Sequence, residues 1–347
     1  MKNLKKGLLV FATLLLVCGC GEIPKTKDGK EAIVTFEKGD TKHDISADEL
    51  YSLLKTKYGF DEVLQMVDTY ILESEFESYK ETAQDYAKSY LDGILKNYES
   101  EEQFLSALQQ NTGYNSIDEY KNYIYLSYMQ SHSIEEYAKS LVTEKQINSY
   151  YEDKAKENIE VYHILITPDV TDDMKDSEKT KAETKAKKEA KALIDEINAS
   201  NDKVETFKNL AKKSSDDTAT KDKGGSLGYI NEFTLGTEYD ELVKAAYSLK
   251  DGEVYASVVT TELGYHVVMR TATKDKSKLE DLKEDITTKL SQEIAAADSN
   301  FTITAMKHYR DLYNLKIVDT DLEKSYRNYM NELQVQANQQ ANQTTEQ

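Results

Sequence analysis

Two histidines and a pair of aspartates are the residues of this 347-residue chain whose types and spacing could do chemistry. His163 and His266 each lie in a short apolar run with strand character. Between them come Ser-Ser-Asp-Asp (residues 214–217) and a glycine-rich turn, Gly-Gly-Ser-Leu-Gly-Tyr (residues 224–229). This order indicates a compact insert in which two histidine-bearing strands bracket the turn.

Several kinds of site are excluded by what the motifs lack. The glycine-rich turn has neither the lysine nor the helix context of a phosphate-binding loop. The five histidines include no His-Glu-x-x-His pair, and the Gly-x-Ser-x-Gly elbow of many serine hydrolases does not occur. Cys18 and Cys20 are the only cysteines, so structural disulfides and thiolate zinc sites are excluded from the body of the protein. The sequence predicts no metal ion and no cofactor.

The charge of the chain limits its partners. The formal charge is -19, from 63 acidic and 44 basic residues, and the acids are spread along the chain. Such a surface repels nucleic acid and anionic lipid, so neither is expected as a ligand. The hydrophobic content of 39% and the charged content of 31% are typical of a soluble protein with a polar surface.

Residues 158–274 mix strand and helix patterns. A buried strand is predicted over Ile159–Ile166, and a lysine- and alanine-rich helix over Ser177–Ile197. Val254–Val259 and Tyr265–Arg270 are two β-rich runs with a short connection, so we expect them to pair as a hairpin. Helices between the strands, together with the hairpin, predict an α+β unit.

The flanking regions 32–157 and 275–330 are mostly helical, and we expect them to fold together as one discontinuous domain. Ser46 and Glu49 have the spacing of a helix-capping box. The many tyrosines of the first flank either pack helices with their hydroxyls in water, or form an amphipathic cradle that holds unfolded chains. Residues 331–347 are rich in Gln, Asn and Thr and are predicted to be disordered.

The amino terminus reads as a targeting segment. Three lysines precede an apolar run over residues 8–17, which is short for a permanent span and is typical of a signal peptide. Val-Cys-Gly-Cys (residues 17–20) resembles the bacterial lipobox, in which a cysteine is lipidated before cleavage. The resemblance implies a signal peptide over residues 1–19, a lipid on Cys20 and a flexible tether over residues 20–31. Ordinary secretion or an uncleaved anchor is the alternative.

The order strand-His, Ser-x-Asp, Gly-Gly-x-Leu-Gly, helix and Gly-Tyr-His-Val-Val resembles one known domain. Residues 158–274 are similar to a parvulin-type peptidyl-prolyl isomerase domain. The whole chain, lipobox included, resembles the PrsA foldase lipoproteins of Gram-positive bacteria, although the helical flanks match more weakly. The resemblance implies an α+β fold, in which a small antiparallel sheet with surrounding helices is inserted in a mainly helical chaperone-like domain.

The resemblance also implies roles for individual residues. The positions matching the family's catalytic residues are His163, Asp216, Thr261 and His266. Asp217 is a register alternative to Asp216. The apolar pocket for the proline ring is expected from Leu242 with Phe233 or Tyr239. Two residues depart from the family pattern: Ser226 stands where an aspartate is usual, and Ile230 where an aromatic residue is common.

A foldase role follows from this resemblance as an expectation. Isomerisation needs no nucleophile, because the barrier is the loss of amide resonance, roughly 18–20 kcal/mol. The protein is expected on the outer face of the cell membrane, held by the lipid on Cys20, where it would act on unfolded secreted proteins. Members of the family can self-associate through the helical frame, so a homodimer is a further candidate partner. The competing hypothesis is a holdase chaperone whose parvulin domain is a catalytically weak or inactive scaffold.

Overall fold

The computed structural model describes residue 29, residues 31–39 and residues 41–345. The expected signal peptide (1–19) and the lipidation site Cys20 lie outside the described residues. Among the helices that are described, none combines the length and the apolar character that a membrane span requires.

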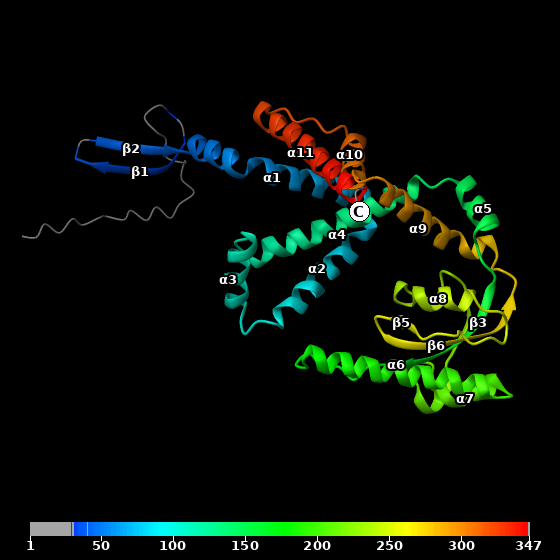
Figure 1. Cartoon of the computed structure of the whole chain (residues 1–347). Coiled ribbons are helices and arrows are strands. Elements are labelled where there is room, and N and C mark those ends of the chain that lie inside the picture. Colours follow the sequence, from blue (N-terminus) through cyan, green and yellow to red (C-terminus); the bar gives the residue numbers. More distant parts are fainter. Residues whose placement is uncertain (1–28, 30, 40, 346–347) are drawn as a thin grey trace, which may run out of the picture. The chain divides into compact units, whose positions relative to one another are not determined.

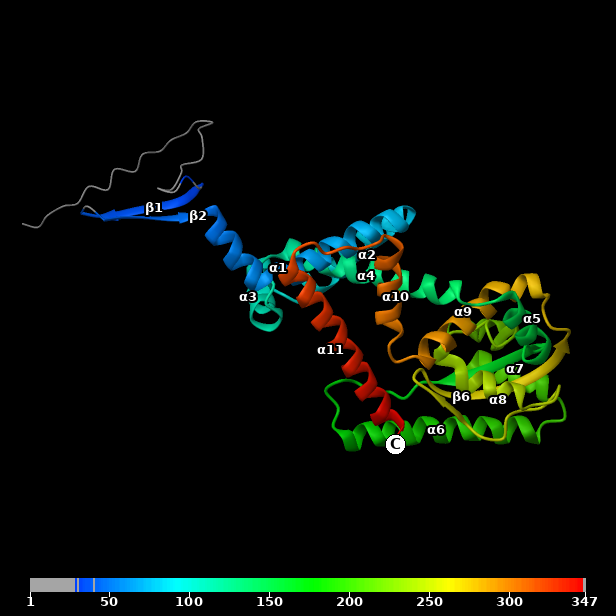
Figure 2. The same ribbon diagram turned by 90° about the horizontal axis from the view of Figure 1, so that it is seen from above.

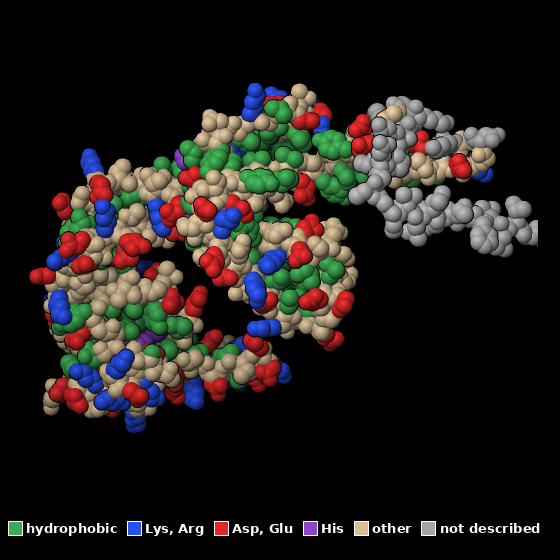
Figure 3. Space-filling view, turned by 180° about the vertical axis from the view of Figure 1, so that it is seen from behind, with side chains coloured by type: hydrophobic (Ala, Val, Ile, Leu, Met, Phe, Trp, Pro, Cys, Tyr) green, Lys and Arg blue, Asp and Glu red, His purple; other side chains and the backbone are tan. Residues whose placement is uncertain are grey.

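The chain divides into two compact units (Figure 1). The first, called the helical unit below, comprises Met1–Ile134 and Ser299–Gln347. The second, called the sheet unit, is Glu135–Asp298. Together they give the α+β class that the sequence predicts. Acidic side chains are spread over the visible face of each unit, among fewer basic ones (Figure 3).

The sheet unit is longer than the insert expected from the sequence. Residues 135–157 and 275–298 belong to it, although the sequence analysis assigned them to the helical flanks. The physical reason is a small core in which Ile147 of helix α5 (Glu144–Asp153) packs against Leu282 and Ile286 of helix α9 (Leu279–Ala297). Phe233, which follows β4, packs against the same core and thereby connects both helices to the sheet unit.

The helical unit consists of one β-hairpin and a set of helices (Figures 1 and 2). Its hairpin leads into the first helix through the predicted capping box: the Ser46 hydroxyl accepts a hydrogen bond from the Glu49 N–H, and the Glu49 carboxylate accepts one from the Ser46 N–H. In chain order the elements are β1 (Ala32–Lys38), β2 (Thr41–Ser46), α1 (Ala47–Glu75), α2 (Lys80–Leu95), α3 (Glu101–Thr112), α4 (Ile117–Ser140), α10 (Phe301–Leu312) and α11 (Thr320–Thr345).

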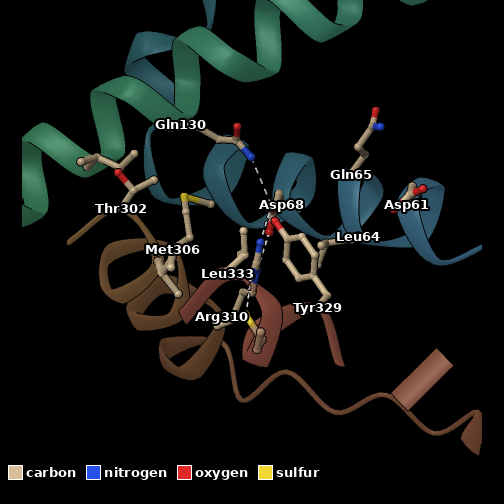
Figure 4. Close-up of a pocket in the computed structure, with 13 residues that line it drawn as sticks. Asp61, Leu64, Gln65, Asp68, Gln130, Thr302, Met306, Arg310, Tyr329 and Leu333 are labelled. Atoms are coloured by element: carbon tan, nitrogen blue, oxygen red, sulfur yellow. Dashed lines mark hydrogen bonds and ion pairs between the residues drawn. The ribbon is translucent and has the colours of Figure 1, made fainter. Parts of the chain in front are cut away.

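A buried ion pair joins three of these helices. Asp68 of α1 and Arg310 of α10 are 3% and 4% exposed, and each oxygen of the carboxylate lies 2.8 Å from an arginine nitrogen (Figure 4). Gln130 of α4 donates a further hydrogen bond to Asp68, at 3.2 Å. Burial by itself would lower the pKa of Arg310, but the hydrogen bonds to Asp68 outweigh it and raise that pKa above its ordinary value. Arg310 therefore stays charged, with the Asp68 carboxylate as its partner.

The end of the chain differs from the sequence prediction. Residues 331–345, which the sequence predicts to be disordered, continue helix α11. Gln, the most frequent residue there, has high helix propensity, and Ala337 is buried. Earlier in the same helix, the ring of Tyr329 lies 5.5 Å from the ring of Phe60 on α1.

The sheet unit is a four-stranded sheet with helices on both faces (Figure 1). The strand order is β4-β3-β6-β5, and every neighbouring pair is antiparallel. Besides α5 and α9, its elements are β3 (Asn158–Ile166), α6 (Asp176–Ala199), α7 (Lys203–Ser214), β4 (Ser226–Ile230), α8 (Asp240–Tyr247), β5 (Val259–Thr261) and β6 (Gly264–Lys274). The expected hairpin is β5–β6, but β5 starts at the end of the predicted run, and Val254 makes only an isolated bridge to Met269.

Alternation along the central strands sends side chains to two different cores. Tyr162 and Ile164 of β3 pack on one face against α6 and α7, together with Phe207. Ile159 and Val161 pack on the other face against α8 and its Leu242. His163 follows Val161 in this alternation and therefore points to the α8 face.

Candidate active site

The two predicted histidines meet on the α8 face of the sheet. β3 and β6 are antiparallel, with His163 opposite Val268 and Leu165 opposite His266. The histidines are therefore diagonal neighbours on one face, with ring centres 5.4 Å apart and planes inclined by 19°. Both are almost completely buried, at 1% and 0% exposed.

A chain of side-chain hydrogen bonds runs through the pair. The Nδ1 atoms of His163 and His266 lie 3.2 Å apart. His163 Nε2 lies 2.8 Å from Oδ2 of Asp217 and 3.1 Å from the hydroxyl of Thr220, which itself donates to the same carboxylate. At the other end, His266 Nε2 lies 2.8 Å from the Thr261 hydroxyl. Residues from β3, β5, β6 and the turn after α7 thus form one network.

The acceptor at one end fixes the direction of every hydrogen bond. Burial by itself would raise the pKa of Asp217, but hydrogen bonds from Thr220 and His163 outweigh it and hold that pKa below its ordinary value. The ionised carboxylate only accepts, so His163 donates through Nε2 and, as a neutral ring, accepts at Nδ1. His266 then donates through Nδ1 and accepts at Nε2 from the Thr261 hydroxyl.

Burial keeps both imidazole rings neutral. Burial, together with the neighbouring His163, lowers the pKa of His266 to about 4 against the attraction of Asp217. Burial also lowers the pKa of His163, although the Asp217 carboxylate opposes this. Neutral rings at pH 7 agree with the hydrogen-bond directions above. The network therefore offers fixed dipoles and one carboxylate charge, which suits electrostatic stabilisation rather than nucleophilic attack.

The turn after α7 presents Asp217, and not Asp216, to the histidines. Asp216 faces away from them: its carboxylate accepts from the Thr167 N–H at 2.8 Å, and its own N–H donates to Leu165 at 2.8 Å. The fully buried Ser215 anchors the turn, because its hydroxyl accepts from the N–H groups of both Leu165 and Asp217. The geometry thus favours the register alternative, and it adds Ser215 and Thr220, which the sequence analysis missed. The hydroxyl residues that precede and follow the two aspartates, in Ser-Ser-Asp-Asp and at Thr220, could have indicated them.

The glycine-rich turn fixes the backbone of β3 beside the site. Gly225 has a positive φ of 81°, and its carbonyl accepts a hydrogen bond from the His163 N–H at 2.8 Å. A Cβ atom at Gly225 would lie 2.2 Å from the His163 carbonyl oxygen, so only glycine fits this position. Ser226 makes a local hydrogen bond in the turn, accepting from the Gly228 N–H at 3.2 Å.

Of the three residues expected in the apolar pocket, the structure brings one against the histidines. The half-buried Tyr239 stands edge-on to both rings, with ring centres 6.4 Å from His163 and 6.2 Å from His266. Leu242 is fully buried behind it, in the core of the α8 face. Phe233 instead packs with α5 and α9, its ring centre 6.1 Å from that of Tyr150.

Two further leucines of the α8 face were missed by sequence reasoning. Leu227 and Leu235 are half-buried and pack against the core that contains Leu242. Each is an apolar residue directly before a glycine, in or after the glycine-rich turn, and this was the available signal. Half-buried apolar side chains of this kind retain a surface that a ligand can cover.

Comparison with known proteins agrees with this geometry. Residues 163–272 match the model of the Rotamase family, described as a PPIC-type PPIASE domain. The matched segment begins at His163 and includes Asp217, Thr261 and His266. The chain therefore carries a peptidyl-prolyl isomerase domain of this type.

Whole-chain relatives extend the match to both units. Foldase protein PrsA of Geobacillus kaustophilus is 31% identical over 285 residues, which cover 82% of this chain and 84% of the relative. Foldase protein PrsA 2 of Bacillus cereus is 28% identical over 319 residues, which cover 92% and 94%. The crystal structure of foldase protein PrsA from Streptococcus pneumoniae shares the fold, with a TM-score of 0.56, 19% sequence identity and coverage of 84% of this chain and 98% of that chain. On this evidence the chain belongs to the PrsA family of foldases.

Proposed function

We propose that the protein catalyses cis/trans isomerisation of X-Pro bonds at the face that carries His163 and His266. The observation that carries the proposal is the hydrogen-bonded chain from Asp217 through both histidines to Thr261, with Tyr239 edge-on against the two rings. The barrier to isomerisation is roughly 18–20 kcal/mol of amide resonance, and it falls when a site binds the twisted peptide better than the planar one. Such catalysis needs orientation and a fixed field, and no charged nucleophile.

The roles of the side chains follow from their surroundings. Tyr239 supplies an apolar wall for the proline ring, stiffened from behind by the buried Leu242. The half-buried Leu227 and Leu235 extend that wall. The neutral histidines and the Asp217 carboxylate set the field around the carbonyl that precedes the proline, which turns as the bond twists. These assignments place Asp217 in the role expected for Asp216, and they leave Phe233 out of the pocket.

An isomerisation assay on the full chain tests this proposal. Magnetisation exchange between the cis and trans forms of a short X-Pro peptide measures the rate without a coupling enzyme. We expect catalysis by the unchanged chain and its loss in His266→Ala, whereas His308→Ala on α10 of the helical unit should keep the full rate. No catalysis by the unchanged chain, with aggregation of an unfolded protein still suppressed, would support the holdase hypothesis instead.

Unfolded secreted proteins are the proposed substrates. X-Pro isomerisation without a catalyst takes tens to hundreds of seconds, slow enough to limit their folding. The supporting observations are the isomerase domain and the relatives named foldase. Refolding of a denatured protein that contains cis-proline should be accelerated by the full chain and less by His266→Ala.

Membrane attachment is proposed through a lipid on Cys20. The support is the lipobox-like sequence at residues 17–20 after an apolar run. Expression in a Gram-positive host, followed by detergent phase separation, should place the chain in the detergent phase. Cys20→Ala should move it to the aqueous phase, and an unchanged distribution would contradict the proposed anchor.

Self-association is proposed through the helical unit. Apolar side chains are exposed on the β1–β2 hairpin and the first turns of α1, among them Phe36, Ile45, Leu53 and Tyr58. An isolated two-stranded hairpin is marginally stable in water, so covering it would stabilise it. Sedimentation equilibrium should show a dimer that Phe36→Ser and Leu53→Ser weaken, and a monomer at all concentrations would refute it.

A further inference from the structure

A groove lined by tyrosines lies between α2 and α4 of the helical unit, where the two helices run side by side (Figures 1 and 2). It holds an open cavity of about 240 Å³, which Ile124 and two serines also line. We call it the tyrosine groove, and its walls are Tyr86, Tyr90, Tyr120, Tyr123 and Tyr128.

Three rings of the tyrosine groove are partly exposed, although they also stack on neighbouring rings. Tyr86 stacks on Tyr128 with ring centres 4.0 Å apart and planes inclined by 15°, and Tyr90 continues this row at 5.8 Å from Tyr86. Tyr86, Tyr90 and Tyr123 are 41%, 46% and 46% exposed. These three therefore have area left for a ligand.

Some tyrosine rings elsewhere in this chain have a cation over one face. In the part of the chain that the structure describes, seven tyrosine rings have a Lys or Arg over them, for example Lys274 at 3.5 Å from the ring centre of Tyr229 and Lys156 at 4.4 Å from that of Tyr247. None of these seven rings belongs to the tyrosine groove. The negative face of a phenol ring attracts ammonium and guanidinium groups, so the groove offers the same chemistry with the cation missing among the described residues.

The charge around the tyrosine groove favours a cation from outside. Residues 80–131 contain eight Asp and Glu and four Lys, which gives 4 − 8 = −4. Two of those lysines are already paired, Lys80 with Glu73 at 3.0 Å and Lys88 with Asp92 at 2.6 Å. The resulting potential attracts cationic chains. The same potential disfavours a second copy of this chain, with a formal charge of -19, as the ligand of the groove itself.

We infer that the tyrosine groove binds arginine and lysine side chains of extended, unfolded polypeptide segments. The inference deepens the proposed foldase function and rests on the proposal that unfolded proteins are the substrates. It gives the helical unit a binding preference of its own. The sheet unit acts on proline, whereas the tyrosine groove binds cationic side chains through the faces of its phenol rings.

The test measures binding of a fluorescent, unstructured peptide to the full chain by anisotropy. The peptide carries arginines spaced by Gly and Ser, and its matched control carries citrulline, which keeps the planar shape and removes the charge. The variants are Tyr86→Leu with Tyr123→Leu, the same pair changed to Phe, and Tyr70→Leu, an exposed tyrosine on α1 outside the groove. All of them keep the net charge, so general electrostatic attraction is constant.

We expect the arginine peptide to bind at least about fivefold more tightly than the citrulline peptide. The Leu pair should weaken it about fivefold, while the Phe pair and Tyr70→Leu change it less than about twofold. Equal binding of both peptides, equal effects of the Leu pair and Tyr70→Leu, or preference for an uncharged proline-rich peptide would overturn the inference.

A second measurement keeps the test decisive if the Leu pair fails to fold. In the unchanged chain, bound arginine peptide should protect Tyr86, Tyr90 and Tyr123 from nitration, and the citrulline peptide should not. Equal nitration with both peptides would overturn the inference. The isomerisation assay on a short X-Pro peptide reports separately on the proposed catalysis. Suppression of aggregation of an uncharged unfolded protein reports separately on binding of unfolded chains.

Discussion

Asp68 of the helical unit and Asp217 of the sheet unit are both carboxylates removed from bulk water, but their partners differ in charge. Asp68 meets a full positive charge, with Arg310 at 2.8 Å on both oxygens. Asp217 meets the neutral His163 and the Thr220 hydroxyl, and its side chain is 18% exposed. The first charge is compensated within the protein and fastens helices together. The second is only partly compensated, so its field is available to a ligand.

Removing the charge of Asp68 should have the largest effect on stability. Asp68→Asn leaves the Arg310 guanidinium buried without a counter-charge, which typically costs about 3–5 kcal/mol of unfolding free energy. Urea unfolding followed by circular dichroism measures it. The matched control is Asp92→Asn, which breaks the exposed pair with Lys88 and should change little. Equal stability of both variants would mean that the ion pair does not fasten the helical unit.

Acid should weaken the sheet unit through its histidines. His266 has a pKa of about 4 in the folded protein and an ordinary value of 6.5 in the unfolded chain. Between those values the unfolded chain binds the proton first, so the stability present above pH 6.5 is lost as the pH falls toward 4, by up to about 3 kcal/mol. Unfolding free energies at pH 7.5, 5.5 and 4.5 measure this, and His266→Asn should flatten the slope. An unchanged slope in that variant would rule out His266 as its source.

Neighbouring aspartates should differ sharply in catalysis. Asp217→Asn keeps the shape of the side chain and removes the charge beside His163, so we expect kcat/KM for an X-Pro peptide to fall about tenfold, or about 1.4 kcal/mol. Asp216→Asn, whose carboxylate binds only the Thr167 N–H among the described contacts, should change it less than about twofold. The reverse result would restore the register in which Asp216 faces the histidines.

The smallest expected effects come from replacing two aromatic residues, one beside the histidines and one away from them. Tyr239→Leu removes the ring that stands against both histidines and should raise KM several-fold, or about 1 kcal/mol. Phe233→Leu should leave the kinetics unchanged and lower the stability by about 1 kcal/mol, because Phe233 packs with α5 and α9. A change in KM for Phe233→Leu would return that residue to the substrate pocket.

Much of the sheet unit could be predicted because its determinants are local. The strands β3 and β6 could be predicted from the apolar runs around His163 and His266, and the antiparallel pairing of β5 with β6 from the short connection between two β-rich runs. The capping box at Ser46 is another short-range pattern that the structure reproduces. Such features depend on residues only a few positions apart, so one sequence suffices to find them.

Other features depend on contacts that spacing does not reveal. Asp216 and Asp217 are adjacent and chemically alike, and the hydroxyl of Ser215 decides between them by binding Leu165 across the fold. Phe233 packs with α5 and α9, which lie far from it in the sequence, after a turn in which the Asn231 side chain accepts from the Phe233 N–H. The ion pair of Asp68 and Arg310 joins residues 242 positions apart, and nothing near either residue signals the other.

The position of Gly225 limits which substitutions this protein can accept. Its Cα lies against the His163 carbonyl, so the first side-chain atom of any other residue would displace the strand that carries the histidine. At Gly228, three positions later, an added Cβ meets nothing within 4 Å, although its positive φ also favours glycine. A library randomised across this turn and selected only for folding should therefore return glycine at 225 whether or not the survivors isomerise proline. Glycine at position 225 is required by the neighbouring strand, so its presence gives no information about the substrate.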